Sequence, residues 1–271
     1  MDSALLLAFA VTLGAGLATG IGSAIAFFAK TTNKGFFALS IGFSAGVMIY
    51  LSFVEILPKA TSYLSEYFTQ VEAAAYAAAA LVGGLILMAV IDALVPSGAN
   101  PHENTQVELM GQKPEHQAQN KALLRMGVFV ALAIAIHNFP EGLATFLLVL
   151  DDPQIGIALA IAVAMHNIPE GIAVSVPVYY ATGSKLKAFR LSFLSGLAEP
   201  AGAVIGYLIL AQFLNHLVLG VIFAMVAGVM IFLAIDTLLP TARNSARGHL
   251  TVYGVIAGMA VMAASLVLLR V

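Results

Sequence analysis

The sequence predicts an all-α polytopic membrane protein with eight transmembrane helices, and three observations support this fold class. Of the 271 residues, 61% are hydrophobic and only 10% are charged, whereas a soluble domain carries about 25% charged residues. Mean hydropathy is +0.97. The apolar residues also gather in eight stretches, each near the length of about 20 residues that crosses a bilayer as a helix.

The predicted helices follow from these apolar stretches in chain order. The first follows only Met1 and Asp2 and lacks a basic leading segment, so we expect a retained helix rather than a cleaved signal peptide. The chain is expected to form a single transmembrane domain over residues 1–271, with a flexible polar loop at about 97–123. The eight helices are expected at 3–29, 36–57, 73–96, 124–149, 154–181, 188–212, 216–239 and 250–269.

Basic residues predict the orientation of the chain. With the N-terminus outside, ten Lys and Arg residues lie in cytoplasmic segments, and only Lys59 and Arg270 lie outside. Cytoplasmic loops of membrane proteins carry such an excess. We therefore expect an integral protein of the cytoplasmic (inner) membrane with both termini extracytoplasmic. The ten are Lys30, Lys34, Lys113, Lys121, Arg125, Lys185, Lys187, Arg190, Arg243 and Arg247.

The second and seventh helices contain the same five residues, Ala-Gly-Val-Met-Ile, at 45–49 and 227–231. A proline follows thirteen residues after each alanine, at Pro58 and Pro240. The two helices run in opposite directions under the expected topology. The pattern predicts an inverted repeat of helices 1–3 and 6–8 around a helix 4–5 hairpin, which is typical of secondary transporters. Similar composition of two apolar helices is the alternative explanation.

One six-residue phrase occurs twice, once in each helix of that hairpin. It reads His-Asn-Phe-Pro-Glu-Gly at 137–142 and His-Asn-Ile-Pro-Glu-Gly at 166–171. Histidine and glutamate four residues apart lie on one face of a helix, so both can point at one centre. Ionisable groups at membrane depth usually mark a route for ions or substrate.

The deep polar groups lack cationic partners in the sequence, because no Lys or Arg lies in the middle of any predicted helix. The buried glutamates must then be protonated or neutralised by a bound cation. Imidazole nearby favours a metal, and nitrogen and oxygen donors without thiolate suit zinc, iron(II), manganese, cobalt or cadmium. Hydrogen bonding between helices is the alternative role for these groups. They are His137, Asn138, Glu141, His166, Asn167, Glu170 and Glu199.

The doubled phrase and the Ala198-Glu199-Pro200 element resemble the ZIP (Zrt/Irt-like) family of divalent-metal transporters, and within it the bacterial ZupT-type zinc-uptake permeases. The resemblance covers the whole chain and implies a two-metal transport site. It assigns His137, Glu141, His166 and Glu170 to one centre. It assigns Asn138, Asn167 and Glu199 to the second, with Glu141 and Glu170 bridging the two.

The resemblance also implies a route and a mechanism. Met48 and Glu55 match positions that line the outer route, and Asp92 and Asp236 match the inner exit. Family likeness further suggests alternating access, with rigid movement of the helix 4–5 region against the rest. The cytoplasmic loop lacks the dense histidine tract that many family members carry, so a metal-sensing role for it has little support.

The function predicted from these observations is import of divalent metal ions, zinc first, by a secondary transporter that is not an enzyme. The metal is the substrate, and no prosthetic group is expected. Expected partners are divalent metal ions and the lipid bilayer, with a homodimer left open and no nucleic acid. Two alternatives remain, a proton-driven solute transporter that uses the carboxylates as a relay and an intramembrane metalloenzyme. The latter lacks its usual His-Glu-x-x-His motif here.

Overall fold

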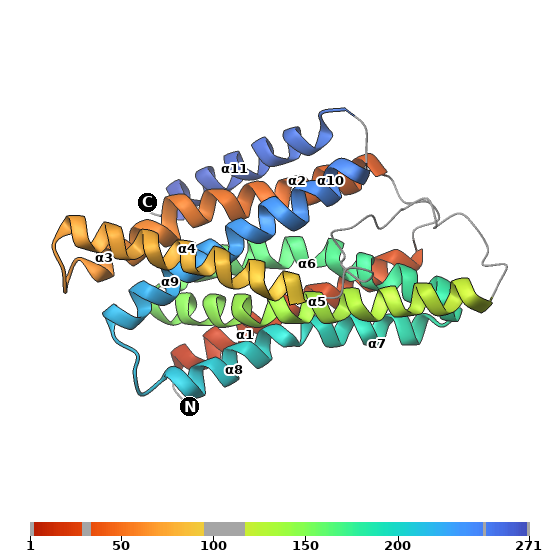
Figure 1. Ribbon diagram of the computed structural model, residues 1–271, viewed down its shortest axis with the longest axis horizontal. Coiled ribbons are helices and arrows are strands. Elements are labelled where there is room, and N and C mark those ends of the chain that lie inside the picture. Colours follow the sequence, from red (N-terminus) through yellow and green to blue (C-terminus); the bar gives the residue numbers. More distant parts are fainter. Residues whose placement is uncertain (1–2, 29–33, 95–116, 246–247, 270–271) are drawn as a thin grey trace.

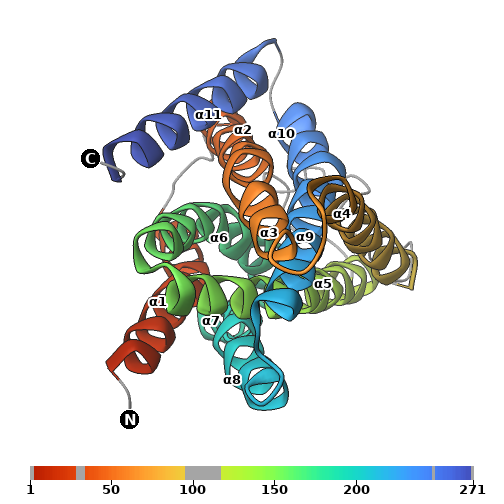
Figure 2. The same ribbon diagram turned by 90° about the vertical axis from the view of Figure 1, so that its left-hand side faces the viewer.

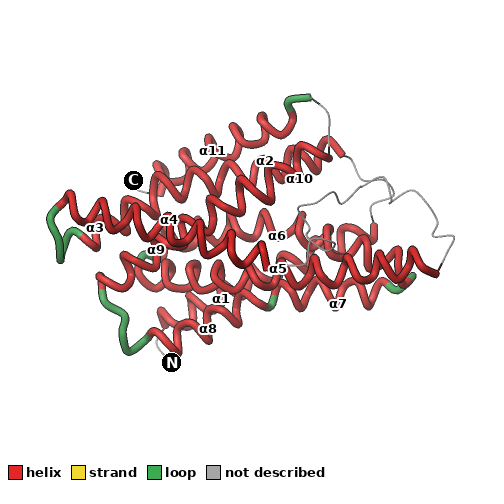
Figure 3. Tube along the Cα trace, in the orientation of Figure 1, coloured by secondary structure: helices red, strands yellow, loops and turns green. Residues whose placement is uncertain are grey.

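The computed structural model describes residues 3–28, 34–94, 117–245 and 248–269 (Figure 1). The described residues form helices and short turns, with no β-strand among them (Figure 3). Eight helical segments in these ranges are long and apolar enough to cross a membrane. The predicted all-α polytopic fold is thereby confirmed.

Five spans are single helices and three are composite. The single helices are α1 (Ser3–Phe28), α4 (Gln70–Leu94), α5 (Gln117–Asp151), α6 (Pro153–Thr182) and α11 (Leu250–Leu269). The first composite span joins α2 (Lys34–Leu51), a π-helical turn (Ser52–Ile56) and α3 (Leu57–Leu64). The second joins α7 (Lys185–Gly196) and α8 (Ala198–Leu210). The third joins α9 (His216–Phe232), a π-helical turn (Leu233–Leu238) and α10 (Leu239–Ser245).

Two predicted helix ends were wrong, because the second and seventh spans continue past their prolines to Leu64 and Ser245. Each proline is the second residue of a helix that follows a π-helical turn. A π-helical turn places one extra residue in each hydrogen-bonded ring. That extra residue lets the helix continue past a proline, which has no N–H to donate.

The fourth span starts earlier than expected. α5 begins at Gln117, so residues 117–123 of the segment predicted as a flexible loop are helical. The remainder of that segment, with His102 and His116, lies outside the described residues.

The helices pack in two groups, which we call the first and second bundles (Figures 1 and 2). In the first bundle, α1 packs along α6, and α5 packs along α6 and α8. In the second bundle, α2 packs along α11, and α9 packs along α3 and α4. The first bundle thus contains α1, α5, α6, α7 and α8, and the second contains α2, α3, α4, α9, α10 and α11.

Equivalent glycines of the five-residue repeat lie at close helix crossings in the second bundle. A Cβ atom on Gly46 of α2 would lie 2.1 Å from the Val255 carbonyl oxygen of α11. A Cβ atom on Gly228 of α9 would lie 2.1 Å from the Leu81 carbonyl oxygen of α4. The absence of a side chain at both positions allows the backbones to touch. The inverted repeat as a whole stays a prediction.

The helix termini and turns can be assigned to the two ends of the molecule. The start of α1 and the end of α11 lie at the same end as the α3–α4, α5–α6 and α8–α9 turns (Figure 1). This arrangement agrees with termini on one side, and which side of the membrane that is stays a prediction. On α4, Val82, Ile86 and Val90 recur every four residues and are about half exposed, forming an apolar face suited to lipid.

Candidate metal site

Both copies of the phrase lie inside long helices that continue through their prolines. Pro140 is internal to α5 and Pro169 is internal to α6. A proline inside a helix removes one N–H donor and leaves the carbonyl four residues earlier without its usual partner. The predicted burial of the polar groups around the prolines is observed. Asn138, Glu141, His166, Asn167 and Glu170 are all buried.

One imidazole joins the two phrases. The Nε2 atom of His166 lies 3.6 Å from Glu141 Oε2 and 3.4 Å from Glu170 Oε1. Glu170 is four residues after His166 on the same helix, as the spacing predicts, whereas Glu141 reaches the imidazole from α5. The structure therefore brings together three of the four residues expected at the first centre. The side chain of the fourth, His137, lies outside the described part of the chain.

A second polar group lies beside the first, at the junction of α7 and α8. The amide nitrogen of Asn167 donates to Glu199 Oε1 and also to the Ala15 carbonyl at 2.9 Å. The amide nitrogen of Asn138 donates to the Ser195 carbonyl at 3.4 Å. These bonds fix both amides through their nitrogen atoms and link the second phrase to Glu199, which has no exposed surface.

Several acceptor atoms in this region have no hydrogen-bond partner among the described residues. They include the Oδ1 atoms of Asn138 and Asn167 and the Oε2 atom of Glu199. A buried acceptor without a partner is costly. Amide and carboxylate oxygens are also the atoms with which these side chains bind cations. The donor set therefore suits a cation as the missing partner.

A break in the sixth span brings Glu199 to this place. The helix is interrupted at Leu197, and Glu199 lies in the first turn of α8. The first turn of a helix presents unpaired N–H groups and positive potential, which suits an acidic side chain. Pro200 fits the same turn, because its missing N–H is not needed there.

The glycine that ends each phrase explains how the surrounding helices come close. A Cβ atom on Gly142 would lie 2.1 Å from the Glu199 carbonyl oxygen, and one on Gly171 would lie 1.9 Å from the Thr19 carbonyl oxygen. Such contacts are shorter than any side chain tolerates. Gly142 thus sets the approach of α8 to α5, and Gly171 sets the approach of α1 to α6.

The four predicted route residues lie in the second bundle rather than beside the phrases. Met48 is buried in α2, and Glu55 is buried in the π-helical turn that follows it. Asp92 lies near the end of α4, and Asp236 lies in the other π-helical turn, where both are partly buried. Their roles along a route stay predictions.

The residues expected to bind metal do not form a complete coordination site in the described part of the chain. No three His, Asp or Glu side chains described here converge closely enough to hold an ion as they stand. The ligand set, which includes His137, therefore stays a prediction. The contacts of His166 with two glutamates and of Asn167 with Glu199 support it.

Thr145 is a buried polar residue that the sequence reasoning missed. It lies one turn beyond Glu141 on the same face of α5, has no exposed surface, and its hydroxyl has no hydrogen-bond partner among the described residues. By contrast, the hydroxyls of Thr12, Thr61 and Thr182 each donate to the carbonyl four residues earlier. Its spacing from Glu141 was the signal available in the sequence.

Comparison with known proteins shows the family to which the chain is similar. The family model described as ZIP zinc transporter matches residues 96–266. A zinc transporter ZupT of Oceanobacillus iheyensis is 58% identical over 269 residues, covering 99% of this chain and 100% of the relative. Proteins of the same name from Lysinibacillus sphaericus and Streptococcus mutans are 55% and 54% identical, each over 99% of this chain. Relatives named as transporters confirm the expectation that the chain is not an enzyme.

Proposed function

Because the chain belongs to the ZIP family of zinc transporters, we propose that it imports zinc through the polar groups shared by α5, α6 and α8. The protein is an integral membrane protein, with eight candidate spans among its described residues. The excess of basic residues in the connections assigned to the cytoplasm supports insertion in the cytoplasmic membrane with both termini outside. A homodimer stays a prediction.

The observation that carries the proposal is the contact of one buried imidazole with carboxylates from two helices. His166 lies between Glu141 and Glu170, at 3.6 and 3.4 Å. Zinc is bound in proteins by neutral imidazole and by carboxylate oxygens. The same donor atoms accept iron(II), manganese, cobalt and cadmium, so discrimination among these ions rests on geometry.

The proposed site has two centres. His137, Glu141, His166 and Glu170 form the first, and Asn138, Asn167 and Glu199 form the second, with Glu141 and Glu170 bridging. The hydrogen bond from Asn167 to Glu199 supports the second grouping. Ions in adjacent centres that share carboxylates repel each other, which assists release. Met48 and Glu55 would line the outer route, and Asp92 and Asp236 the inner exit.

The division into two bundles supports alternating access. All the residues proposed to hold metal belong to the first bundle, and all four route residues belong to the second. Movement of one bundle against the other would expose the site to one side of the membrane at a time. Such movement gives transport if both conformations bind the ion and their populations interchange.

Zinc uptake by the purified chain in liposomes tests the proposal directly. Glu141→Ala should abolish or greatly slow uptake of radiolabelled zinc, because it removes a carboxylate that bridges both proposed centres. A matched control is Glu72→Gln, which removes a carboxylate that accepts hydrogen bonds from Thr69 beside the start of α4. Uptake by Glu141→Ala at the rate of the unmodified chain, with equal protein per liposome, would refute the central site.

Thermal stabilisation separates metal transport from the proton-relay alternative. A ligand that binds only the folded state raises the unfolding temperature as its concentration rises. Zinc should therefore stabilise the unmodified chain and stabilise Glu141→Ala less. A carrier that uses the carboxylates only to move protons would show no stabilisation by zinc in either protein.

A further inference from the structure

Lys59 is, with Arg270, one of two exceptions to the predicted distribution of basic residues, because it lies at the end of the molecule that we assign to the outside. It belongs to α3, one turn before Tyr63 on the same helix. A fixed positive charge near the outer route of a cation importer repels the substrate unless a negative group neutralises it. The structure shows what neutralises Lys59.

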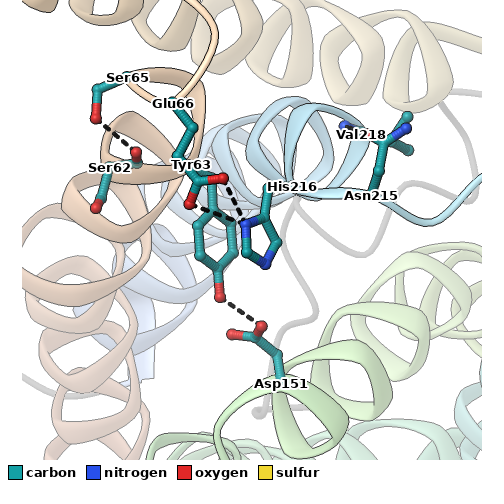
Figure 4. A network of polar contacts seen from close by, with 8 residues as sticks. All are labelled: Ser62, Tyr63, Ser65, Glu66, Asp151, Asn215, His216 and Val218. Atoms are coloured by element: carbon teal, nitrogen blue, oxygen red, sulfur yellow. Dashed lines mark hydrogen bonds and ion pairs between the residues drawn. The ribbon is translucent and has the colours of Figure 1, made fainter.

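Lys59 and Tyr63 both contact the turn between α5 and α6. Figure 4 shows Tyr63 pointing at Asp151. The Lys59 ammonium lies 2.7 Å from Asp151 Oδ2 and 3.4 Å from Asp152 Oδ2. The Tyr63 hydroxyl donates to the other oxygen of Asp151, Oδ1. The side chains of Lys59 and Asp151 are only 15% and 13% exposed, so water screens this pair less than it screens a surface pair.

These contacts connect the two bundles. Lys59 and Tyr63 belong to the second bundle, whereas Asp151 ends α5 and Asp152 caps α6 in the first bundle, accepting from the N–H of Ile155. The carboxylates are therefore held by their own bundle while their partners come from the other.

The second bundle also holds Tyr63 in position. The Tyr63 ring stacks on the His216 ring of α9, with centroids 4.5 Å apart and planes within 5°. The Nδ1 atom of His216 in turn lies 2.7 and 2.8 Å from the two oxygens of Glu66 (Figure 4). A tyrosine that is held in this way loses little freedom when it bonds to Asp151.

We propose that Lys59, Tyr63, Asp151 and Asp152 form a latch that closes the outer end of the transporter. In the conformation described here the latch is made, and it holds the outer ends of the two bundles together. Parting of the bundles at this end requires the ion pair and the tyrosine hydrogen bond to break. The strength of the latch thus sets how often the central site opens to the outside.

This inference rests on the proposed movement of the two bundles, and its test is independent of zinc transport. The chain has no cysteine, so one introduced cysteine gives labelling without background. Leu148→Cys provides the reporter, because Leu148 is buried in the last turn of α5, where its carbonyl accepts from the N–H of Asp152. Spheroplasts that express the full chain are treated with a membrane-impermeant maleimide in zinc-free medium, and the labelling rate is measured.

Opening the latch should accelerate labelling. Lys59→Gln and Tyr63→Phe, each combined with the reporter, should label about fivefold faster, the factor that a contact of modest strength supplies. Exchanging the charges with Lys59→Glu and Asp151→Lys should restore at least half of the shielding. Glu72→Gln is the matched control, because it removes a carboxylate at the same end within one bundle.

Unchanged labelling in both Lys59→Gln and Tyr63→Phe would overturn the latch, as would equal acceleration by Glu72→Gln. Acceleration that the charge exchange does not reverse would also overturn it, since that result indicates general loosening. Size-exclusion profiles of the purified variants establish that each is folded. If labelling follows the latch while Glu141→Ala still carries zinc, the proposed site fails and the latch stands.

Discussion

Glu199 differs from the other buried carboxylates of the site in its surroundings. Its Oε1 atom accepts from Asn167, and it stands at the start of α8 rather than on the phrase helices. In the proposed scheme it belongs to one centre only, whereas Glu141 bridges both. Glu199→Gln should therefore slow uptake less than Glu141→Ala and alter the preference among zinc, iron(II) and manganese. Rates unchanged for every metal tested would rule out the two-centre assignment.

Thr145 supports a second prediction at the level of single residues. Its hydroxyl is buried without a hydrogen-bond partner among the described residues and lies one turn from Glu141. Thr145→Val keeps the shape of the side chain and removes the hydroxyl, so the KM for zinc should rise about threefold or more if the hydroxyl orients Glu141 or the ion. Thr145→Ser should recover the lost affinity. Thr12→Val, which removes a hydroxyl bonded within α1, is the matched control and should leave the KM unchanged.

The sequence was informative about which residues are buried and polar, and less so about their partners. Two histidine–glutamate spacings within apolar helices sufficed to predict the burial of His166 and Glu170. The bond between Asn167 and Glu199 joins helices whose relative rotation no local spacing encodes. Thr145 escaped notice because a threonine in a helix commonly bonds to its own backbone.

At the level of helices, the glycines that end the phrases lie at close crossings that leave no room for a side chain. Gly171→Ala would place a Cβ atom 1.9 Å from the Thr19 carbonyl oxygen, so α1 and α6 must separate. Overpacking of this kind costs about 1–3 kcal/mol. The variant should melt at lower temperature and transport zinc more slowly. Gly83→Ala is the control, because a Cβ atom there meets nothing within 4 Å. Equal melting temperatures for the two variants would contradict the close crossing.

Helix positions were predictable from apolar length, whereas two helix ends were not. The helices containing Pro58 and Pro240 continue because a π-helical turn precedes each proline. A proline usually ends or kinks a helix at such places. A π-helical turn has no characteristic amino-acid composition, so the sequence did not predict it. The start of α5 was missed for a similar reason, since residues 117–123 are polar enough to read as loop.

The arrangement of the whole molecule depends on pairings that the repeat did not reveal. The sequence predicted an inverted repeat of helices 1–3 and 6–8, which does not say which helices pack together. In the structure the first span packs with the fourth, fifth and sixth. Close approach through glycine decides these partners, as at Gly171 against α1. Which glycine faces which helix follows from tertiary packing, so the two bundles emerged only with the structure.

The two bundles lead to a prediction for the transporter as a whole. Ser52 shares one π-helical turn with Glu55, and Thr237 directly follows Asp236 in the other. Ser52→Cys and Thr237→Cys therefore place a reporter near each acidic residue. Under alternating access, conditions that make Ser52→Cys reactive from outside should shield Thr237→Cys from inside, and the reverse. Saturating zinc should shift the two labelling rates in opposite directions, because a ligand moves a conformational equilibrium only through its different affinity for the two states.

Serine and threonine at these positions make the substitutions conservative, and the absence of native cysteine removes background labelling. Glu141→Ala in each cysteine variant is the matched control, since a chain that no longer binds zinc at the centre should show rates that zinc does not change. A channel would leave both positions reactive together, because one continuous route then joins the two sides. Simultaneous reactivity of Ser52→Cys and Thr237→Cys would therefore exclude alternating access, and opposite shifts that disappear with Glu141→Ala would tie the movement of the bundles to the central site.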